Sequence, residues 1–302
     1  MRAADEKQTQ TQQPTQPTQP TLPTLPTLPC ADCHRVIADE HARSRHDDAA
    51  DNAVFAAGFA REPHDRCIAC HAPTRQLRGT THDGVSCAAC HVRDGVVWSA
   101  RSAAGYGHAV AVDDALADER ACAGCHEFDA HEKVDGVERL LPGVPMQTTV
   151  SEWRAWRAAL GPGDEAKSCQ DCHMPRDVFG HARHDVVKGA HDVGALRDAL
   201  VVDVEAGASG DEVVFSSRGV GHDFPTGDVF RRLLVSVDDV VIATFDRRAP
   251  LRPFEARTVR LPQRARRLVV TYHYADDAEE ERGVVSYEEL VVVIADITLR
   301  GR

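Results

Sequence analysis

Short apolar runs separated by polar or glycine-containing breaks dominate the chain from about residue 196 to the C-terminus. The runs are rich in Val, Ile, Leu and Tyr, and they cover residues 200–204, 212–216, 233–237, 240–244, 258–261, 268–274 and 290–299. Runs of this length and composition predict β-strands, and seven of them in roughly a hundred residues are typical of an antiparallel β-sandwich. We therefore predict a β-sandwich domain over residues 196–302, with its first strand at residues 199–205.

The acidic pair Asp238-Asp239 falls between two of these runs, where a hairpin turn is the simplest interpretation. Residues 196–302 contain no cysteine and no cluster of titratable groups at motif spacing. We therefore do not expect this domain to be an independent catalytic unit.

Helical signals before residue 196 are short, and loops dominate. The alanine-rich stretch 43–61 and the stretch 150–160 are the helix candidates, and we expect Ser151 to cap the second. Residues 9–29 carry Thr-Gln-Pro and Thr-Leu-Pro repeats, which favour an extended tether. The predicted fold class is α+β: a disordered tether at residues 1–29, a loop-rich, mainly helical domain at 30–195, and then the β-sandwich.

All ten cysteines belong to five copies of Cys-x-x-Cys-His. The copies are Cys30-Ala-Asp-Cys33-His34, Cys67-Ile-Ala-Cys70-His71, Cys87-Ala-Ala-Cys90-His91, Cys122-Ala-Gly-Cys125-His126 and Cys169-Gln-Asp-Cys172-His173. Two thiols three residues apart on a tight turn can both form thioethers to one haem, and the histidine that follows then lies under the iron. The pattern predicts five covalently attached c-type haems.

Disulfide bonds and zinc sites are the alternative interpretations of paired cysteines. Neither requires a histidine after every pair, whereas haem attachment does. Haem macrocycles would also supply core that the chain lacks, because only 42% of the residues are hydrophobic and 5% are aromatic.

A formal net charge of −12 argues against a nucleic-acid partner, since phosphate binding relies on clustered Lys and Arg. Haem propionates would make the surface more acidic, so a docking partner is expected to present a basic or metallic face. Residues 1–29 hold no apolar run typical of a signal peptide, and no stretch elsewhere predicts a membrane span. Haem attachment takes place outside the cytoplasmic membrane, so we expect a periplasmic or extracellular protein whose export signal was removed or whose start is misassigned.

Eleven histidines remain after the five that follow the cysteine pairs, and five would suffice as distal ligands. Five stand out: His46 in the first helix candidate, His108 before the fourth motif, His184 and His191 after the fifth, and His222 in a turn rich in Gly and Pro. A solvated surface histidine is the simpler interpretation of any one of them. The less favoured histidines are His41, His64, His82, His131, His181 and His273.

Methionine ligation would raise the potential of a haem relative to His/His ligation. Met174 adjoins His173 and cannot easily reach the opposite face of that haem, and Met146 lies in a predicted loop. With histidines in surplus, we expect His/His ligation throughout and low potentials.

One segment of the β domain is unusual: residues 221–227, followed by Arg231-Arg232. A structural turn with two solvated arginines is one interpretation. The favoured alternative is that His222 reaches a haem across the domain interface and that the arginines face haem propionates, which suit a guanidinium fork.

The order of these motifs resembles that of a family of secreted bacterial multihaem c-type cytochromes with a C-terminal β domain. The resemblance covers about residues 30–235. It rests on Cys169-Gln-Asp-Cys172-His173-Met174-Pro175, His184, Gly189-Ala-His191 and Gly221-His222-Asp-Phe-Pro-Thr-Gly227 with Arg231-Arg232, and also on Gly84-Val85-Ser86-Cys87 and Thr149-Val150-Ser151-Glu152-Trp153. It implies that His46, His108, His184, His191 and His222 are the distal ligands, whereas His82, His131 and the N-terminal repeats match no family position.

Two functions fit these features. In the first, closely spaced six-coordinate haems transfer electrons. In the second, one five-coordinate haem is the catalytic centre of an oxidoreductase for a small nitrogen or sulfur compound, as in multihaem reductases that the architecture resembles. All five motifs end in His and the spare histidines exceed the need, so we predict electron transfer and assign no catalytic residue. The expected partners are other redox proteins or cytochromes, with self-assembly or an outer-membrane complex left open.

Overall fold

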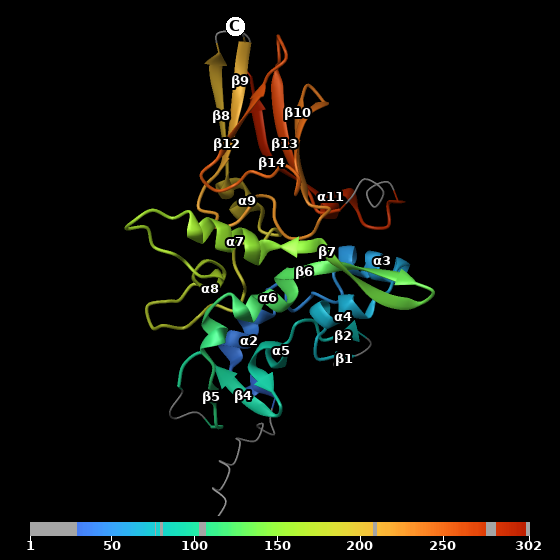
Figure 1. Ribbon diagram of the computed structural model, residues 1–302, viewed down its shortest axis with the longest axis vertical. Coiled ribbons are helices and arrows are strands. Elements are labelled where there is room, and N and C mark those ends of the chain that lie inside the picture. The colour runs from blue at the N-terminus through green and yellow to red at the C-terminus, as the bar shows by residue number, and fades with distance from the viewer. Residues whose placement is uncertain are drawn as a thin grey trace, which may run out of the picture.

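The computed structural model describes residues 29–299 apart from 76, 79–80, 103–106, 208–209 and 276–281, so the predicted tether lies outside the described residues except for its last one. The architecture mixes helices with mainly antiparallel sheets. Figure 1 shows two parts along the long axis: a pair of β-sheets at one end, and short helices, strands and loops at the other. Helix α7 (Thr149–Ala158) and the strands β6 (Glu127–Val134) and β7 (Val137–Thr148) lie between them (Figure 1).

Each of the seven predicted apolar runs overlaps a strand of the β part. The strands are β8 (Leu200–Gly207), β9 (Gly210–Ser217), β10 (Arg232–Val237), β11 (Val240–Phe245), β12 (Ala256–Arg260), β13 (Arg267–His273) and β14 (Val291–Thr298), and the short helix α11 (Tyr287–Leu290) precedes the last. They form a four-stranded sheet in the order β11-β10-β13-β14 and a three-stranded sheet in the order β12-β9-β8. Every neighbouring pair is antiparallel.

Alternation along the strands gives each sheet one apolar face. In β10, Leu233, Val235 and Val237 are buried while the residues between them are partly exposed, as expected when successive side chains point to opposite faces. The two sheets share one hydrophobic core. Within it, Phe215 of β9 packs against Phe245 of β11 with ring centroids 5.2 Å apart.

The pair Asp238-Asp239 forms the hairpin turn between β10 and β11, as predicted. Both residues have positive φ, 46° and 66°, which is the conformation of the two-residue turn that matches the twist of paired strands. The Asp238 carboxylate accepts hydrogen bonds from the backbone N–H groups of Arg266 and Arg267 at 3.2 and 3.1 Å. The turn is thereby tied to the start of β13.

Short helices make up much of the part before residue 196. They are α1 (Cys30–Cys33), α2 (Arg35–His41), α3 (Ala53–Arg61), α4 (Asp65–His71), α5 (Cys87–His91), the 3₁₀ helix η1 (Asp114–Ala117), α6 (Arg120–His126), α7 and α8 (Cys169–His173), and α9 (Val193–Ala199) leads into the β part. None of the helices in the described part of the chain is both long enough and apolar enough to cross a membrane.

The first helix candidate, residues 43–61, is helical only in its second half. Asn52 caps α3 by accepting a hydrogen bond from the backbone N–H of Phe55 at 3.0 Å, and the residues before it form turns. His46 therefore lies on a turn and not on a helix.

The second candidate is helix α7, but its predicted cap is wrong. The helix begins at Thr149, so Ser151 lies inside its first turn. The Ser151 hydroxyl donates a hydrogen bond to Glu127 at the start of β6. Ser151 thus fastens α7 to the neighbouring hairpin.

The prediction of a mainly helical domain is incomplete, because strands also occur before residue 196. Besides the β6–β7 hairpin, these are β1 (Leu77–Arg78), β2 (Thr81–His82), β3 (Val92–Arg93), β4 (Val96–Ser99) and β5 (Ala111–Val112). Strand β7 contains Pro142, Gly143 and Pro145, which are residues that argue against a strand in a sequence. Met146 consequently lies in a strand and not in a loop.

Apolar burial is uneven along the chain. Among the described residues, nineteen hydrophobic side chains from residue 196 onwards are buried, but only six before it. The six are Ala49, Ile68, Ala72, Val96, Val150 and Trp153. The described residues of the part that carries the cysteine motifs therefore form no buried side-chain core comparable to that of the β part.

Candidate haem-binding site

The five cysteine motifs all form short helices. Each of α1, α4, α5, α6 and α8 contains one Cys-x-x-Cys pair, and residues three apart on a helix lie on the same face. Both thiols of a pair therefore point to the same side. All ten cysteines are free, so the disulfide alternative does not apply to this structure.

One cavity of about 2730 Å³ is lined by all ten cysteines and by the five histidines that follow them. A cavity for a single drug-sized ligand measures roughly 300–1,000 Å³. The space is therefore large enough for several cofactors.

Four of the five motif histidines face a second histidine from elsewhere in the chain. The ring centroids are 6.0 Å apart for His34 and His108, 6.5 Å for His46 and His126, 6.2 Å for His91 and His184, and 6.3 Å for His173 and His222. A metal-bound imidazole nitrogen lies roughly 2 Å from the metal, so two imidazoles that share one metal have centroids roughly 6 Å apart. The spacing of these pairs fits one iron between each.

Backbone carbonyls orient most of these rings. The Nδ1 atoms of His71, His91 and His173 lie 2.6, 2.8 and 2.9 Å from the carbonyls of Ala49, Trp98 and Val187, and those of His108, His184 and His222 lie 3.2, 2.7 and 2.8 Å from the carbonyls of Ala109, Ala182 and Asp223. A ring whose Nδ1 donates to a carbonyl presents Nε2 as the free lone pair, which is the arrangement that second-shell contacts give to metal-binding histidines.

Burial keeps several of these rings neutral. It lowers the pKa of His46, His71, His184, His191 and His222, and it lowers the pKa of His126 to about 4. The neutral imidazole is the form that binds a metal. The cavity thus favours the ligating form of these histidines before any ligand is considered.

His71 and His191 do not form a fifth pair. The His71 ring stacks on Phe55, with centroids 3.9 Å apart and planes 12° from parallel. The His191 ring lies against Gly189, where an added Cβ would come within 2.7 Å of it. In the part of the chain that the structure describes, no imidazole faces His71 at the spacing of the other pairs. The side chain of His82 lies outside the described residues.

Most of the less favoured histidines have other partners. His41 Nε2 is 2.9 Å from the Val85 carbonyl, His64 Nε2 is 3.1 Å from Glu62, and His273 Nε2 is 2.8 Å from the Thr271 hydroxyl. His131 differs, because its Nδ1 is buried without a hydrogen-bond partner among the described residues and the residue lines the cavity. In the sequence it stands between Ala130 and Glu132, in a strand that the pattern did not predict, so its burial gave no signal there.

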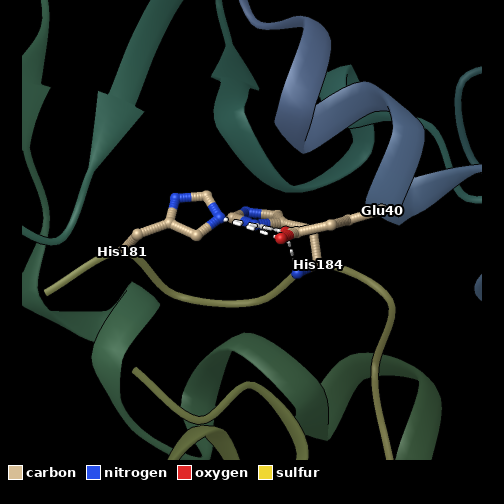
Figure 2. A group of neighbouring side chains, drawn as sticks. All are labelled: Glu40, His181 and His184. Carbon is tan, nitrogen blue, oxygen red and sulfur yellow. Dashed lines mark hydrogen bonds and ion pairs between the residues drawn. The ribbon is translucent and has the colours of Figure 1, made fainter. Parts of the chain in front are cut away.

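His181 joins Glu40 and His184 in a cluster that resembles a metal site (Figure 2). The Glu40 carboxylate lies 3.0 Å from His181 Nε2 and accepts a hydrogen bond from the backbone N–H of His184 at 2.9 Å. The Nδ1 of His184 is 4.0 Å from the carboxylate and is engaged by the Ala182 carbonyl. We therefore interpret the cluster as a hydrogen-bonded network and not as a separate metal site.

Neighbouring motifs contact each other through their thiols. Cys70 of the second motif and Cys125 of the fourth lie close enough to shift each other's pKa, and so do Cys122 of the fourth and Cys169 of the fifth. Cys30 of the first motif lies close enough to Cys87 of the third to raise its pKa, although burial is the larger cause. The motifs are thus packed side by side.

The loop that carries His222 is fixed against α7. Glu152 of α7 accepts hydrogen bonds from the hydroxyls of Thr226 and Thr148 at 2.5 and 2.7 Å. Burial, with the Glu152 carboxylate as the second cause, raises the pKa of Asp223 to about 6. These contacts join the β part to the cavity.

Arg231 is enclosed at the same junction. Its side chain is hydrogen-bonded to Tyr272, and one of its nitrogens lies 3.5 Å from the Thr226 carbonyl. The guanidinium packs on Gly227, where an added Cβ would come within 3.0 Å of it and where a φ of +93° favours glycine. Arg231 lines the cavity and, among the described residues, forms no ion pair within 4 Å. Arg232 points elsewhere and donates to the Ala275 carbonyl at 2.9 Å.

A scan against protein-family models finds no match, and no curated protein matches the sequence. Among solved structures, the chain is similar to a penta-heme cytochrome c552 from Thermochromatium tepidum, with a TM-score of 0.65 and 18% sequence identity. The similarity covers 89% of this chain and 97% of that one. The chain therefore shares the fold of a multihaem c-type cytochrome.

Proposed function

We propose that this chain transfers electrons through five covalently attached haem c groups with His/His ligation. The observation that carries the proposal is the set of four imidazole pairs with centroids 6.0–6.5 Å apart. In each pair one histidine belongs to a cysteine motif. A haem supplies the reversible Fe(III)/Fe(II) couple, and two imidazole ligands set it to a low potential relative to His/Met ligation.

The protein residues attach, orient and space the cofactors. His34, His91, His126 and His173 act as proximal ligands, with His108, His184, His46 and His222 opposite them, respectively. His71 is the proximal ligand at the second motif, and His191 is the remaining candidate on its distal side. The thiol contacts between motifs support close cofactor spacing, which electron transfer needs.

The proposal is tested by EPR of the oxidised full-length protein together with its intact mass. The expected mass is the polypeptide plus five haems, and the expected spectrum is low-spin. Fewer than five attached haems would contradict the haem count, and high-spin signal from any of them would contradict His/His ligation at that haem.

A second candidate function follows from His71. It is the one motif histidine that faces no imidazole among the described residues, and Phe55 covers its ring. In this alternative, the second motif carries a five-coordinate haem that binds a small nitrogen or sulfur compound. One equivalent of high-spin ferric haem, together with one equivalent of carbon monoxide bound after reduction, would favour it. Neither signal is expected if His191 or another side chain completes the ligation.

We propose that residues 30–195 form the haem domain and that the two sheets of residues 196–302 form a β-sandwich domain that closes over the last haems. Arg231 would face a haem propionate, because an enclosed guanidinium requires an anion. We propose a periplasmic or extracellular location and other redox proteins as partners.

A further inference from the structure

Glu40 connects two motifs that are far apart in the sequence. It lies on α2, which begins directly after His34 of the first motif. Its carboxylate reaches the loop after the fifth motif, where it accepts a hydrogen bond from the backbone N–H of His184 at 2.9 Å. His184 in turn faces His91 of the third motif. One side chain thus joins helix α2 to the loop that holds a distal imidazole.

The Glu40 side chain is mostly buried, and it also contacts a second histidine. Only 14% of the Glu40 side chain is exposed, and its two oxygens lie 3.2 and 3.0 Å from His181 Nε2. Figure 2 shows both histidines on the same loop, with dashed lines from the Glu40 carboxylate to each of them. A side chain that holds the loop at two points fixes the direction in which the His184 ring leaves the backbone.

The carboxylate is also a net negative charge beside that ring. It accepts a hydrogen bond from the backbone N–H of His184 and lies 3.0 Å from His181 Nε2, and such contacts favour the charged carboxylate. The nearby cation Arg183 is already paired with Asp185, whose oxygen accepts from its Nε at 3.1 Å. The charge of Glu40 is therefore not cancelled by Arg183.

From this geometry we infer that Glu40 is the positioning residue for His184 and that its charge lowers the potential of the haem held between His91 and His184. The inference rests on the proposed ligation and adds to it a residue outside the ligand set. A negative charge close to an iron favours the ferric over the ferrous state, and the effect is larger where protein excludes water. The hydrogen bonds orient the His184 ring, and the carboxylate charge lowers the potential of that haem.

Two substitutions separate these effects. Glu40→Gln keeps the size and an oxygen that can accept from His184, while its amide can donate to His181, so all haems should stay low-spin. The lost charge should shift the midpoint potential of one haem upward. Glu40→Ala removes both hydrogen bonds, so a fraction of one haem should become high-spin as His184 is released.

Asp39 provides the matched control. It precedes Glu40 on α2 and is exposed, so Asp39→Asn removes the same charge from the same helix without touching the loop. Potentiometric titration followed by visible spectra, with EPR of the oxidised forms and haem content by mass, gives the readouts. We expect Asp39→Asn to match the wild type in spin state and to show a much smaller shift in potential.

The outcomes separate this inference from the proposed function. His184→Ala should convert one haem to high spin; if it does not, the ligation itself is wrong. If His184→Ala does so but Glu40→Ala stays fully low-spin and Glu40→Gln leaves every potential unchanged, the role of Glu40 is refuted while the ligation stands. An equal shift in Asp39→Asn and Glu40→Gln would also overturn it, because a general charge effect would then suffice.

Discussion

Local geometry holds the His222 imidazole in place. Its Nδ1 bonds to the Asp223 carbonyl at 2.8 Å, and its ring lies 9° from parallel to that of His173. Gly221 packs so closely on Trp156 that an added Cβ would come within 3.1 Å of the indole. The backbone on one side of the ring is therefore anchored to α7, and the ring has little freedom to turn away.

Replacing His222 by alanine should convert one haem, that of the fifth motif, to high spin and leave the others unchanged. The reason is that His173 would lose the only imidazole that faces it at ligand spacing in the described structure. EPR of the oxidised protein measures the change. His41→Gln is the control, because His41 Nε2 lies within hydrogen-bond distance of the Val85 carbonyl and a glutamine amide can donate to the same carbonyl. An unchanged spectrum in His222→Ala would contradict the assignment.

Some functional residues can be predicted from the sequence, and others cannot. The attachment motifs are local, because both thiols and the histidine lie within five consecutive positions, so spacing alone predicts their chemistry. The partner of each motif histidine depends on the tertiary fold, and no spacing rule could have paired His34 with His108 or His46 with His126. Glu40 gave no signal at all, since a carboxylate on a short polar helix is ordinarily a solvated side chain.

Among the elements, the strands of the β part were predictable because alternation of apolar and polar residues is a local pattern that a sheet with one buried face imposes. The β6–β7 hairpin was not predictable on this basis. Its first strand, EFDAHEKV, has few apolar residues, and its second is interrupted by Pro and Gly. Its pairing is supported by contacts with α4, such as that of Arg66 over Phe128 at 4.8 Å. Such contacts cannot be seen in one sequence.

The β10–β11 turn supports a prediction about stability. Asp239 has a φ of 66°, a conformation that costs an ordinary residue energy and costs glycine little. Asp239→Gly should raise the free energy of unfolding of the β part by about 0.5–1 kcal/mol, which corresponds to a rise in Tm of a few degrees. Thermal melting followed by circular dichroism measures it.

Asp238→Gly is the matched comparison for this turn. Asp238 also has positive φ, but its carboxylate accepts the hydrogen bonds of Arg266 and Arg267. Losing these hydrogen bonds should cost more stability than glycine gains at a positive φ, so the Tm of Asp238→Gly should fall. A lower Tm in Asp239→Gly, or equal shifts in the two variants, would show that the turn is not under this constraint.

At the scale of the whole molecule, the two parts differ in what holds them together. The β part has a continuous core formed by both of its sheets. The part before residue 196 has six buried hydrophobic residues among those described, and three of them, Ala49, Val150 and Trp153, line the cavity of about 2730 Å³. Low aromatic content and five attachment motifs predicted this dependence on cofactors from the sequence, whereas the docking of α7 on the His222 loop could be seen only in the fold.

A chain that cannot attach haem should therefore lose one part and keep the other. With all ten cysteines replaced by alanine, we expect residues 30–195 to become sensitive to protease. Burial of apolar surface contributes about 25 cal/mol per Å², and a part with so few buried side chains gains too little from it to stay folded. Residues from 196 onwards should remain as a resistant fragment with β-type circular dichroism. Limited proteolysis with mass spectrometry, run beside the haem-loaded wild type, identifies the fragments. Protection of residues 30–195 without haem would mean that side chains alone fold this part. Simultaneous loss of both parts would mean that the β core depends on the haems as well.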